Sequence, residues 1–137
     1  MDVLLDTGPW VAMIDRSEKK HKICIKWLKN FSGRMFSTEA VLTEVLYLLN
    51  FSYDAQAGAM DFVLTGAVTV MPSSVESIKA AKQLMLKYRD IPMDFADASL
   101  VVLANDLSIS NIVTFDVRDF SIYRTAAKGH YTIIPGA

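Results

Sequence analysis

The sequence predicts an α/β domain of three layers, with helices on both faces of a mainly parallel sheet of about five strands. Short apolar segments that suit strands alternate along the chain with longer segments that show helical spacing. Gly, Pro and Ser residues separate these segments, and the chain has no internal repeat and no low-complexity linker. Because 137 residues is an ordinary length for one domain, we expect residues 1–137 to form a single domain.

The expected elements follow from local composition. Strands are expected at β-branched or aromatic segments, namely 3–5, 34–37, 67–71, 112–115 and 131–134. Helices are expected to begin at Thr7, where Pro9 suits a first helical position, and to cover about 19–31, 40–49, 53–64, 73–88 and 95–105. Ser73 and Glu76 have the spacing of a capping box for the helix that follows. Between the fourth strand and the last one we expect a polar loop.

The composition is rich in apolar residues, at 52%, with a mean hydropathy of +0.27. No uninterrupted apolar run approaches the roughly 20 residues that span a bilayer, and the N-terminus lacks the pattern of a signal peptide. We therefore expect a cytoplasmic protein with no membrane contact, whose excess apolar surface forms a core and a subunit interface. The single cysteine, Cys24, excludes an internal disulfide and a Cys-rich zinc site, and we expect it to be a small helix residue.

Charge is distributed unevenly, although the net charge is only −1. The segment 35–78 contains no Lys or Arg, whereas Lys19, Lys22 and Lys26 lie along one face of the predicted helix 19–31. This lysine face is either solvated surface or a contact for RNA. The lysine face could thus bind phosphates, and the segment 35–78 could bind a protein.

Acidic residues in the last third of the chain suggest a site. Asp94 and Asp97 are three residues apart at the start of a predicted helix, so both project from the same side of its first turn. Asp116 directly follows a predicted strand. A structural explanation is also open, because Asp94 suits an N-cap, Asp97 could complete a capping box and Asp116 could form an Asx turn.

Two acids are expected at the edge of the sheet where ligands bind. Asp6 and Asp116 each follow the carboxyl end of a strand, and parallel α/β sheets bind ligands beyond those ends, where the strand order switches. They can be neighbours only if their strands are adjacent. Glu44 lies in the middle of an apolar helix, where it either faces water or points inward toward a ligand.

The convergence of Asp6, Glu44, Asp97 and Asp116 would create a site for a cation. At roughly 4 Å and an effective dielectric constant of about 20, each ionised pair would cost about 4 kcal/mol, so the site must take up protons or bind cations. Oxygen ligands without His or Cys select Mg²⁺ or Mn²⁺. Such an ion suits hydrolysis of phosphodiester bonds.

The substrate backbone would need basic side chains at the rim of this site. Arg118 and Arg124 are the basic residues nearest to Asp116 in the sequence, and we expect them to guide it. No segment of the chain resembles a module that reads bases.

Four motifs in their order along the chain resemble those of one family. They are Leu4-Leu-Asp-Thr7, Thr38-Glu-Ala-Val-Leu-Thr-Glu44, Asp94-Phe-Ala-Asp-Ala98 and Thr114-Phe-Asp-Val-Arg-Asp-Phe120. With these motifs the chain resembles PIN-domain proteins of the VapC type, the toxin ribonucleases of toxin–antitoxin pairs. The resemblance covers nearly the whole chain.

The resemblance implies a Mg²⁺ or Mn²⁺ site and an endoribonuclease activity that hydrolyses RNA. The ligands it implies are Asp6, Glu44, Asp97 and Asp116, with Asp94, Asp119, Thr7 and Thr114 in support. Asp94 and Asp97 both fit the acid at the helix start, and we favour Asp97 because Ala98 and a continuous apolar helix follow it. The resemblance also implies a homodimer and an antitoxin partner, for which the stretch 35–78 offers a surface.

The same residues also bear on other classes of protein. A non-catalytic RNA- or protein-binding module on the same fold is the alternative that stays open, although the intact acids argue against it. A phosphoryl-accepting regulator or an Asp-x-Asp phosphatase is disfavoured, because Thr7 and Gly8 follow Asp6. The sequence does not indicate which RNA would be cut.

Overall fold

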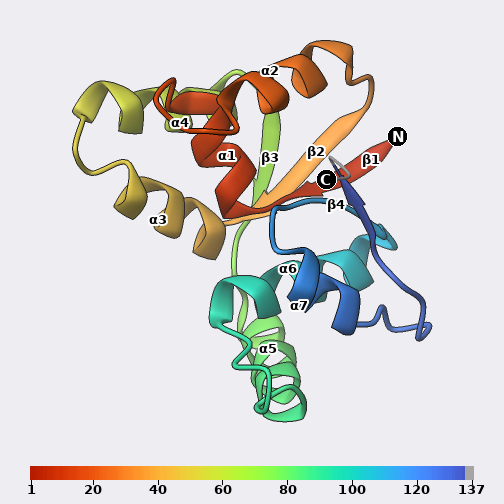
Figure 1. Cartoon of the computed structure of the whole chain (residues 1–137). Coiled ribbons are helices and arrows are strands. Elements are labelled where there is room, and N and C mark those ends of the chain that lie inside the picture. The colour runs from red at the N-terminus through yellow and green to blue at the C-terminus, as the bar shows by residue number, and fades with distance from the viewer. Residues whose placement is uncertain (135–137) are drawn as a thin grey trace.

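A parallel sheet of five strands forms the centre of the computed structural model, which describes residues 1–134 (Figure 1). The strands are β1 (Asp2–Leu5), β2 (Arg34–Thr38), β3 (Val68–Met71), β4 (Asn111–Val113) and β5 (Thr132–Ile134), in the order β3-β2-β1-β4-β5. All four neighbouring pairs are parallel. The predicted α/β architecture of three layers is confirmed; residues 135–137, the end of the predicted domain, lie outside the described residues.

Helices cover both faces of this sheet. They are α1 (Thr7–Ile14), α2 (His21–Asn30), α3 (Glu39–Leu48), α4 (Tyr53–Leu64), α5 (Val75–Lys87), α6 (Phe95–Leu107) and α7 (Val117–Ile122). In Figure 1, α1, α2 and α4 lie above the sheet, and α5, α6 and α7 lie below it. Helix α3 packs against α1 and α4 on one side and against α6 on the other, so it closes one end of the layered structure.

The core is built around the central strand β1. Val3, Leu4 and Leu5 are all 0% exposed, which explains why this strand is a continuous apolar run rather than an alternating one. Trp10 of α1 and Cys24 of α2 are buried in the layer above. Cys24 is a helix residue, as the sequence predicts, and the structure shows that it is buried.

Side chains at the N-termini determine where most helices begin. Thr38 accepts a hydrogen bond from the backbone N–H of Val41 and caps α3. The capping box of α5 differs from the prediction, because Ser74 and Ser77 form it rather than Ser73 and Glu76. Ser74 has the same side chain as Ser73 and lies one residue later, so the sequence pattern alone could not determine which of the two serines caps α5.

Two further predictions about local structure need correction. Pro9 is the third residue of α1 rather than the first, a position that still needs no intrahelical N–H donor. The segment expected to be a polar loop contains α7, whose six residues are too few to show helical periodicity. The sequence did contain a signal for the start of α7, because aspartate is a favoured N-cap residue. In the structure Asp116 caps α7 and accepts a hydrogen bond from the N–H of Asp119 at 3.1 Å.

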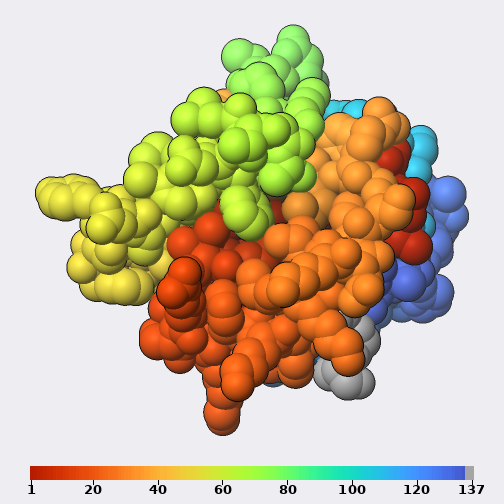
Figure 2. Space-filling view, turned by 90° about the horizontal axis from the view of Figure 1, so that it is seen from above, coloured from red at the N-terminus to blue at the C-terminus, as the bar shows by residue number. Residues whose placement is uncertain are grey.

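The end of the molecule formed by α3 and α4 exposes large apolar side chains. Figure 2 shows the connection between these helices, in yellow, projecting from the body of the molecule. The exposed side chains there are Tyr47 (71%), Leu48 (47%), Phe51 (66%) and Tyr53 (90%). They lie within the stretch 35–78 that lacks Lys and Arg. Within residues 1–134, no helix has both the length and the apolar character needed to span a membrane.

Candidate metal centre

The carboxyl ends of β1 and β4 bring the first two predicted acids to the same edge of the sheet. The strands pair directly, with Leu5 opposite Val113, and the N–H of Asp6 donates to the carbonyl oxygen of Val113 at 3.0 Å. Strand β1 has β2 on its other side, so this edge is where the order of strands switches. The predicted adjacency of the strands that precede Asp6 and Asp116 is confirmed, although β4 ends at Val113, so Thr114 and Phe115 separate it from Asp116.

Asp6 is held by its neighbours at this edge. It is only 8% exposed, and its Oδ1 accepts from the N–H of Thr7 at 2.8 Å. Its Oδ2 accepts from the hydroxyl of Thr114 at 2.7 Å. The same hydroxyl accepts from the N–H of Asp116 at 2.9 Å, so Thr114 links the two acids.

Helices α6 and α7 each direct a pair of acids toward the same place. Asp94 is the N-cap of α6 and its Oδ1 accepts from the N–H of Asp97 at 2.8 Å. Asp116 has the same relation to Asp119 in α7. Capping therefore accounts for the spacing of both pairs, and the structural and functional explanations of these acids are compatible.

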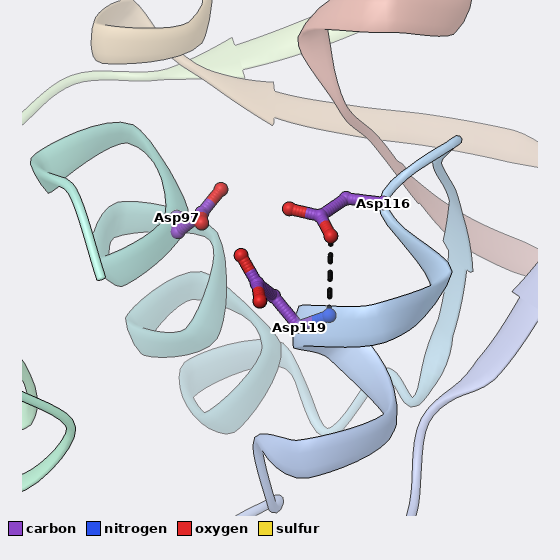
Figure 3. A group of neighbouring side chains, drawn as sticks. All are labelled: Asp97, Asp116 and Asp119. Carbon is purple, nitrogen blue, oxygen red and sulfur yellow. Dashed lines mark hydrogen bonds between the residues drawn. The ribbon is translucent and has the colours of Figure 1, made fainter. Parts of the chain in front are cut away.

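Three of these carboxylates converge in space. Figure 3 shows Asp97 of α6 facing Asp116 and Asp119 of α7, with the hydrogen bond between the last two drawn as a dashed line. One carboxylate oxygen from each of the three lies within 4.8 Å of the others. Asp94 is not part of this close group, although it lines the same pocket.

A pocket brings all of the predicted acids together. It is lined by Asp6, Thr7, Gly8, Glu44, Leu48, Pro92, Asp94, Asp97, Phe115, Asp116 and Asp119. Glu44 thus lines the pocket from α3 rather than lying on a wet face remote from it. The buried hydroxyl of Thr7 has no hydrogen-bond partner among the described residues. It lies close enough to Glu44 to lower the pKa of the Glu44 carboxyl.

Burial, and after it the proximity of the other acids, raises the pKa values of several carboxyl groups in this pocket. Burial, followed by the charges of Asp94 and Asp6, raises the pKa of Asp97 to about 8. Burial is also the main cause that raises the pKa of Asp6 and of Glu44, and other acids of the pocket raise both further. A pKa of about 8 for Asp97 favours the protonated carboxyl near neutral pH when no cation is bound.

Two residues near the acids were not identified from the sequence. The hydroxyl of Tyr123 donates to Oδ2 of Asp97 at 3.1 Å, and the pKa of Tyr123 is raised by burial and by the charge of Asp97, so it remains a donor. The spacing of four between Asp119 and Tyr123 would have placed them on one helix face, had α7 been recognised. Lys20 lies over the ring of Phe115, with Nζ 4.8 Å from the ring centroid.

The predicted basic residues lie at different positions around the molecule. Lys22 and Lys26 are on α2 and do not line the acidic pocket, whereas Lys19 precedes Lys20 in the turn before α2. Arg118 is exposed in the first turn of α7. Arg124 uses Nη1 to donate to the carbonyl oxygens of residues 121–123, at the carboxyl end of that helix.

The donor set fits a hard divalent cation. Carboxylate oxygens line the pocket, and no His or Cys is among the lining residues described. The unpartnered hydroxyl of Thr7 adds a buried polar atom that an ion or its water could satisfy.

The PIN-domain profile matches residues 3–128, which are most of the chain. The chain belongs to the PIN-domain family. One relative of this PIN domain is Ribonuclease VapC26 of Mycobacterium tuberculosis (strain ATCC 25618 / H37Rv), which is 27% identical over 135 residues, 97% of this chain and 100% of the relative.

Solved structures with the same fold include a VapC toxin and a toxin–antitoxin complex. The PIN domain superposes on the crystal structure of Mycobacterium tuberculosis VapC20, a toxin that cleaves the sarcin-ricin loop, with a TM-score of 0.79 and 20% identity, covering 85% of this chain and 91% of that one. A toxin–antitoxin complex from Klebsiella pneumoniae matches with a TM-score of 0.66 and 16% identity, covering 87% and 90%. At these identities the structures establish the fold alone.

Proposed function

We propose that this PIN domain, which we take to comprise residues 1–137, is an endoribonuclease that hydrolyses RNA phosphodiester bonds with Mg²⁺ or Mn²⁺. The observation that carries the proposal is the pocket shared by Asp6, Glu44, Asp97 and Asp116, which come from four separate segments of the chain. A relative that is named a ribonuclease supports the reaction class. The VapC20 toxin that shares the fold cleaves the sarcin-ricin loop.

The four acids would hold the ion, and Asp94, Asp119, Thr7 and Thr114 would support them. Asp6 accepts hydrogen bonds at both oxygens, Asp116 accepts one from Asp119, and Asp97 accepts one from Tyr123. Their carboxylates are thus oriented before any ligand arrives, which lowers the cost of binding. When bound, the ion would activate a water molecule for attack and neutralise charge on the phosphate.

Protonation is coupled to binding at this site. Because its pKa is raised to about 8, Asp97 would release a proton on binding a cation, so the affinity for the ion would increase with pH. The metal-free pocket carries negative charge that would repel a polyanion, so a bound cation also favours the approach of RNA.

Basic side chains near the rim would contact the RNA backbone. Lys20 is the best placed, because its ammonium group lies over Phe115, which lines the pocket. Lys19 precedes it, and Lys22 and Lys26 extend the positive charge along α2. Arg118, exposed on α7, lies close enough to lower the pKa of Asp119. Nη1 of Arg124 already donates to carbonyl oxygens at the end of α7, so only its other guanidinium nitrogens would contact the RNA backbone.

We further propose that the protein is the toxin of a toxin–antitoxin pair and acts in the cytoplasm, on cellular RNA. Solved structures that share the fold include a toxin–antitoxin complex, which supports a protein partner. The exposed apolar side chains of the α3–α4 end, Tyr47, Leu48, Phe51 and Tyr53, offer surface for an antitoxin and for a homodimer.

The test is metal-dependent cleavage by the purified, partner-free protein. Structured and single-stranded RNAs are incubated with Mg²⁺, with Mn²⁺ and with EDTA, and the wild type is compared with Asp6→Asn. We expect cleavage that requires the metal and is lost in Asp6→Asn, with circular dichroism as the control for folding. Absence of Mn²⁺ binding by calorimetry would contradict the proposal and favour a non-catalytic binding module.

A further inference from the structure

The hydroxyl of Tyr123 donates a hydrogen bond to the carboxylate of Asp97, and no other side chain among the described residues does so. Tyr123 does not itself line the acidic pocket. Tyr123 is 0% exposed, yet its oxygen lies 3.1 Å from Oδ2 of Asp97. A buried phenol is most simply explained as core packing. The contact with Asp97 is unexplained by packing alone, because a phenylalanine would fill nearly the same volume.

The ring of Tyr123 is held by other aromatic rings. Phe120 packs edge-to-face against it, with centroids 5.1 Å apart and planes at 82°, and Tyr88 packs at 5.0 Å and 65°. The Tyr88 hydroxyl also accepts from the N–H of Arg124, the next residue in the chain. The hydroxyl of Tyr123 therefore approaches Asp97 from a fixed direction.

The position of Tyr123 in α7 connects this contact to the other acids. Asp116 caps the start of α7, Asp119 lies in its first turn and Tyr123 is its C-cap. The helix thus supplies two carboxylates and the donor that holds the third. Asp97 is also restrained through its N–H, which donates to Asp94. Oδ2 accepts from Tyr123, whereas Oδ1 of Asp97 has no hydrogen bond within the described residues and is available to a cation.

We propose that Tyr123 is a positioning residue for the metal centre, holding the carboxylate of Asp97 in the orientation that binds the ion. This inference rests on the proposed function. Partners that hydrogen-bond to a ligating carboxylate fix its orientation and lower the entropy lost on binding. Tyr123 is not among the residues that line the acidic pocket, so it would act on the ion through Asp97.

The chain offers a matched control in the same aromatic cluster. The ring of Tyr131 packs against Phe120 at 5.8 Å and 88°, and Tyr131 is 7% exposed. Its hydroxyl is buried without a hydrogen-bond partner in the described structure. Tyr123→Phe and Tyr131→Phe therefore make the same chemical change in the same surroundings, and only the first removes a hydrogen bond to an acid.

The experiment measures Mn²⁺ affinity by isothermal titration calorimetry and RNA cleavage for the wild type and both variants. We expect Tyr123→Phe to weaken Mn²⁺ binding by about tenfold and to lower kcat with little change in KM for RNA, whereas Tyr131→Phe should match the wild type. In crystals of metal-free Tyr123→Phe, the Asp97 side chain should leave the rotamer that it adopts in the wild type.

Two failures can be told apart. If the wild type binds Mn²⁺ and cuts RNA, and Tyr123→Phe equals Tyr131→Phe in affinity and kcat, the proposed function stands and the role of Tyr123 is overturned. If the wild type neither binds Mn²⁺ nor cuts RNA, the proposed function itself fails, and the inference fails with it. Thermal unfolding of both variants shows whether any loss of affinity comes from loss of folding.

Discussion

The hydroxyl of Thr114 donates a hydrogen bond of 2.7 Å to Oδ2 of Asp6, although the two residues are 108 positions apart in the chain. The bond joins the ends of β1 and β4, the two strands whose pairing creates the site. It also accounts for how a buried carboxylate is tolerated there, because Asp6 receives donors at both oxygens.

Thr114→Val should destabilise the protein, because it removes that donor and the acceptor for the N–H of Asp116. We expect the free energy of unfolding in EDTA to fall by about 1–3 kcal/mol, as measured by urea denaturation. Thr114→Ser keeps the hydroxyl and loses one methyl group, so its loss should be smaller. Equal losses in the two variants would indicate that the methyl group, not the hydrogen bond, matters.

Asp97 rather than Asp94 should bind the ion. Asp94→Asn retains a good N-cap for α6, whereas Asp97→Asn removes a carboxylate from the group within 4.8 Å. We expect Asp97→Asn to weaken Mn²⁺ binding by more than about tenfold and Asp94→Asn to weaken it less, measured by calorimetry. The reverse order would make Asp94 the ligand.

The stability of the metal-free protein should decrease as the pH rises from about 4 to about 8. In this range the folded protein keeps a proton on Asp97, whose pKa is raised to about 8 from a usual 3.8, and the unfolded chain has lost it. The unfolded state therefore binds fewer protons, and raising the pH favours it. Urea midpoints in EDTA at several pH values within this range measure the effect.

Asp97→Asn is the control for this pH dependence, because asparagine does not titrate. The slope of stability against pH should become shallower in the variant, although Asp6 and Glu44, whose pKa values are also raised, should keep part of it. An unchanged slope would mean that Asp97 ionises normally in the folded protein.

Lys20 should contribute more to RNA binding than Lys26, because its ammonium group lies over Phe115 at the acidic pocket. We expect Lys20→Gln to raise KM for RNA, and to reduce the slope of log(kcat/KM) against log salt by about 0.7 if one phosphate contact on a single strand is lost. Lys26→Gln is the matched control on α2. A larger effect in the control would indicate that RNA follows the lysine face instead.

Local patterns in the sequence determined most of the fold. The continuous apolar run before Asp6 specifies a strand that is buried on both faces, and Thr38 and Asp94 specify helix starts, because these effects depend only on nearby residues. Asp6, Asp97 and Asp116 could be singled out in advance because strand ends and first turns of helices are local features, whereas Asp119 was named only through the resemblance to the PIN family. The exception was α7, which is too short to show a period.

Only the tertiary structure decided how the acids are held. The distance between carboxylates of Asp97, Asp116 and Asp119 depends on how α6 lies against α7, and no local pattern specifies that packing. The contacts of Tyr123 with Asp97 and of Lys20 with Phe115 likewise join residues that are distant in the chain. Side chains so far apart in sequence meet only when the packing of the core fixes the relative positions of their elements.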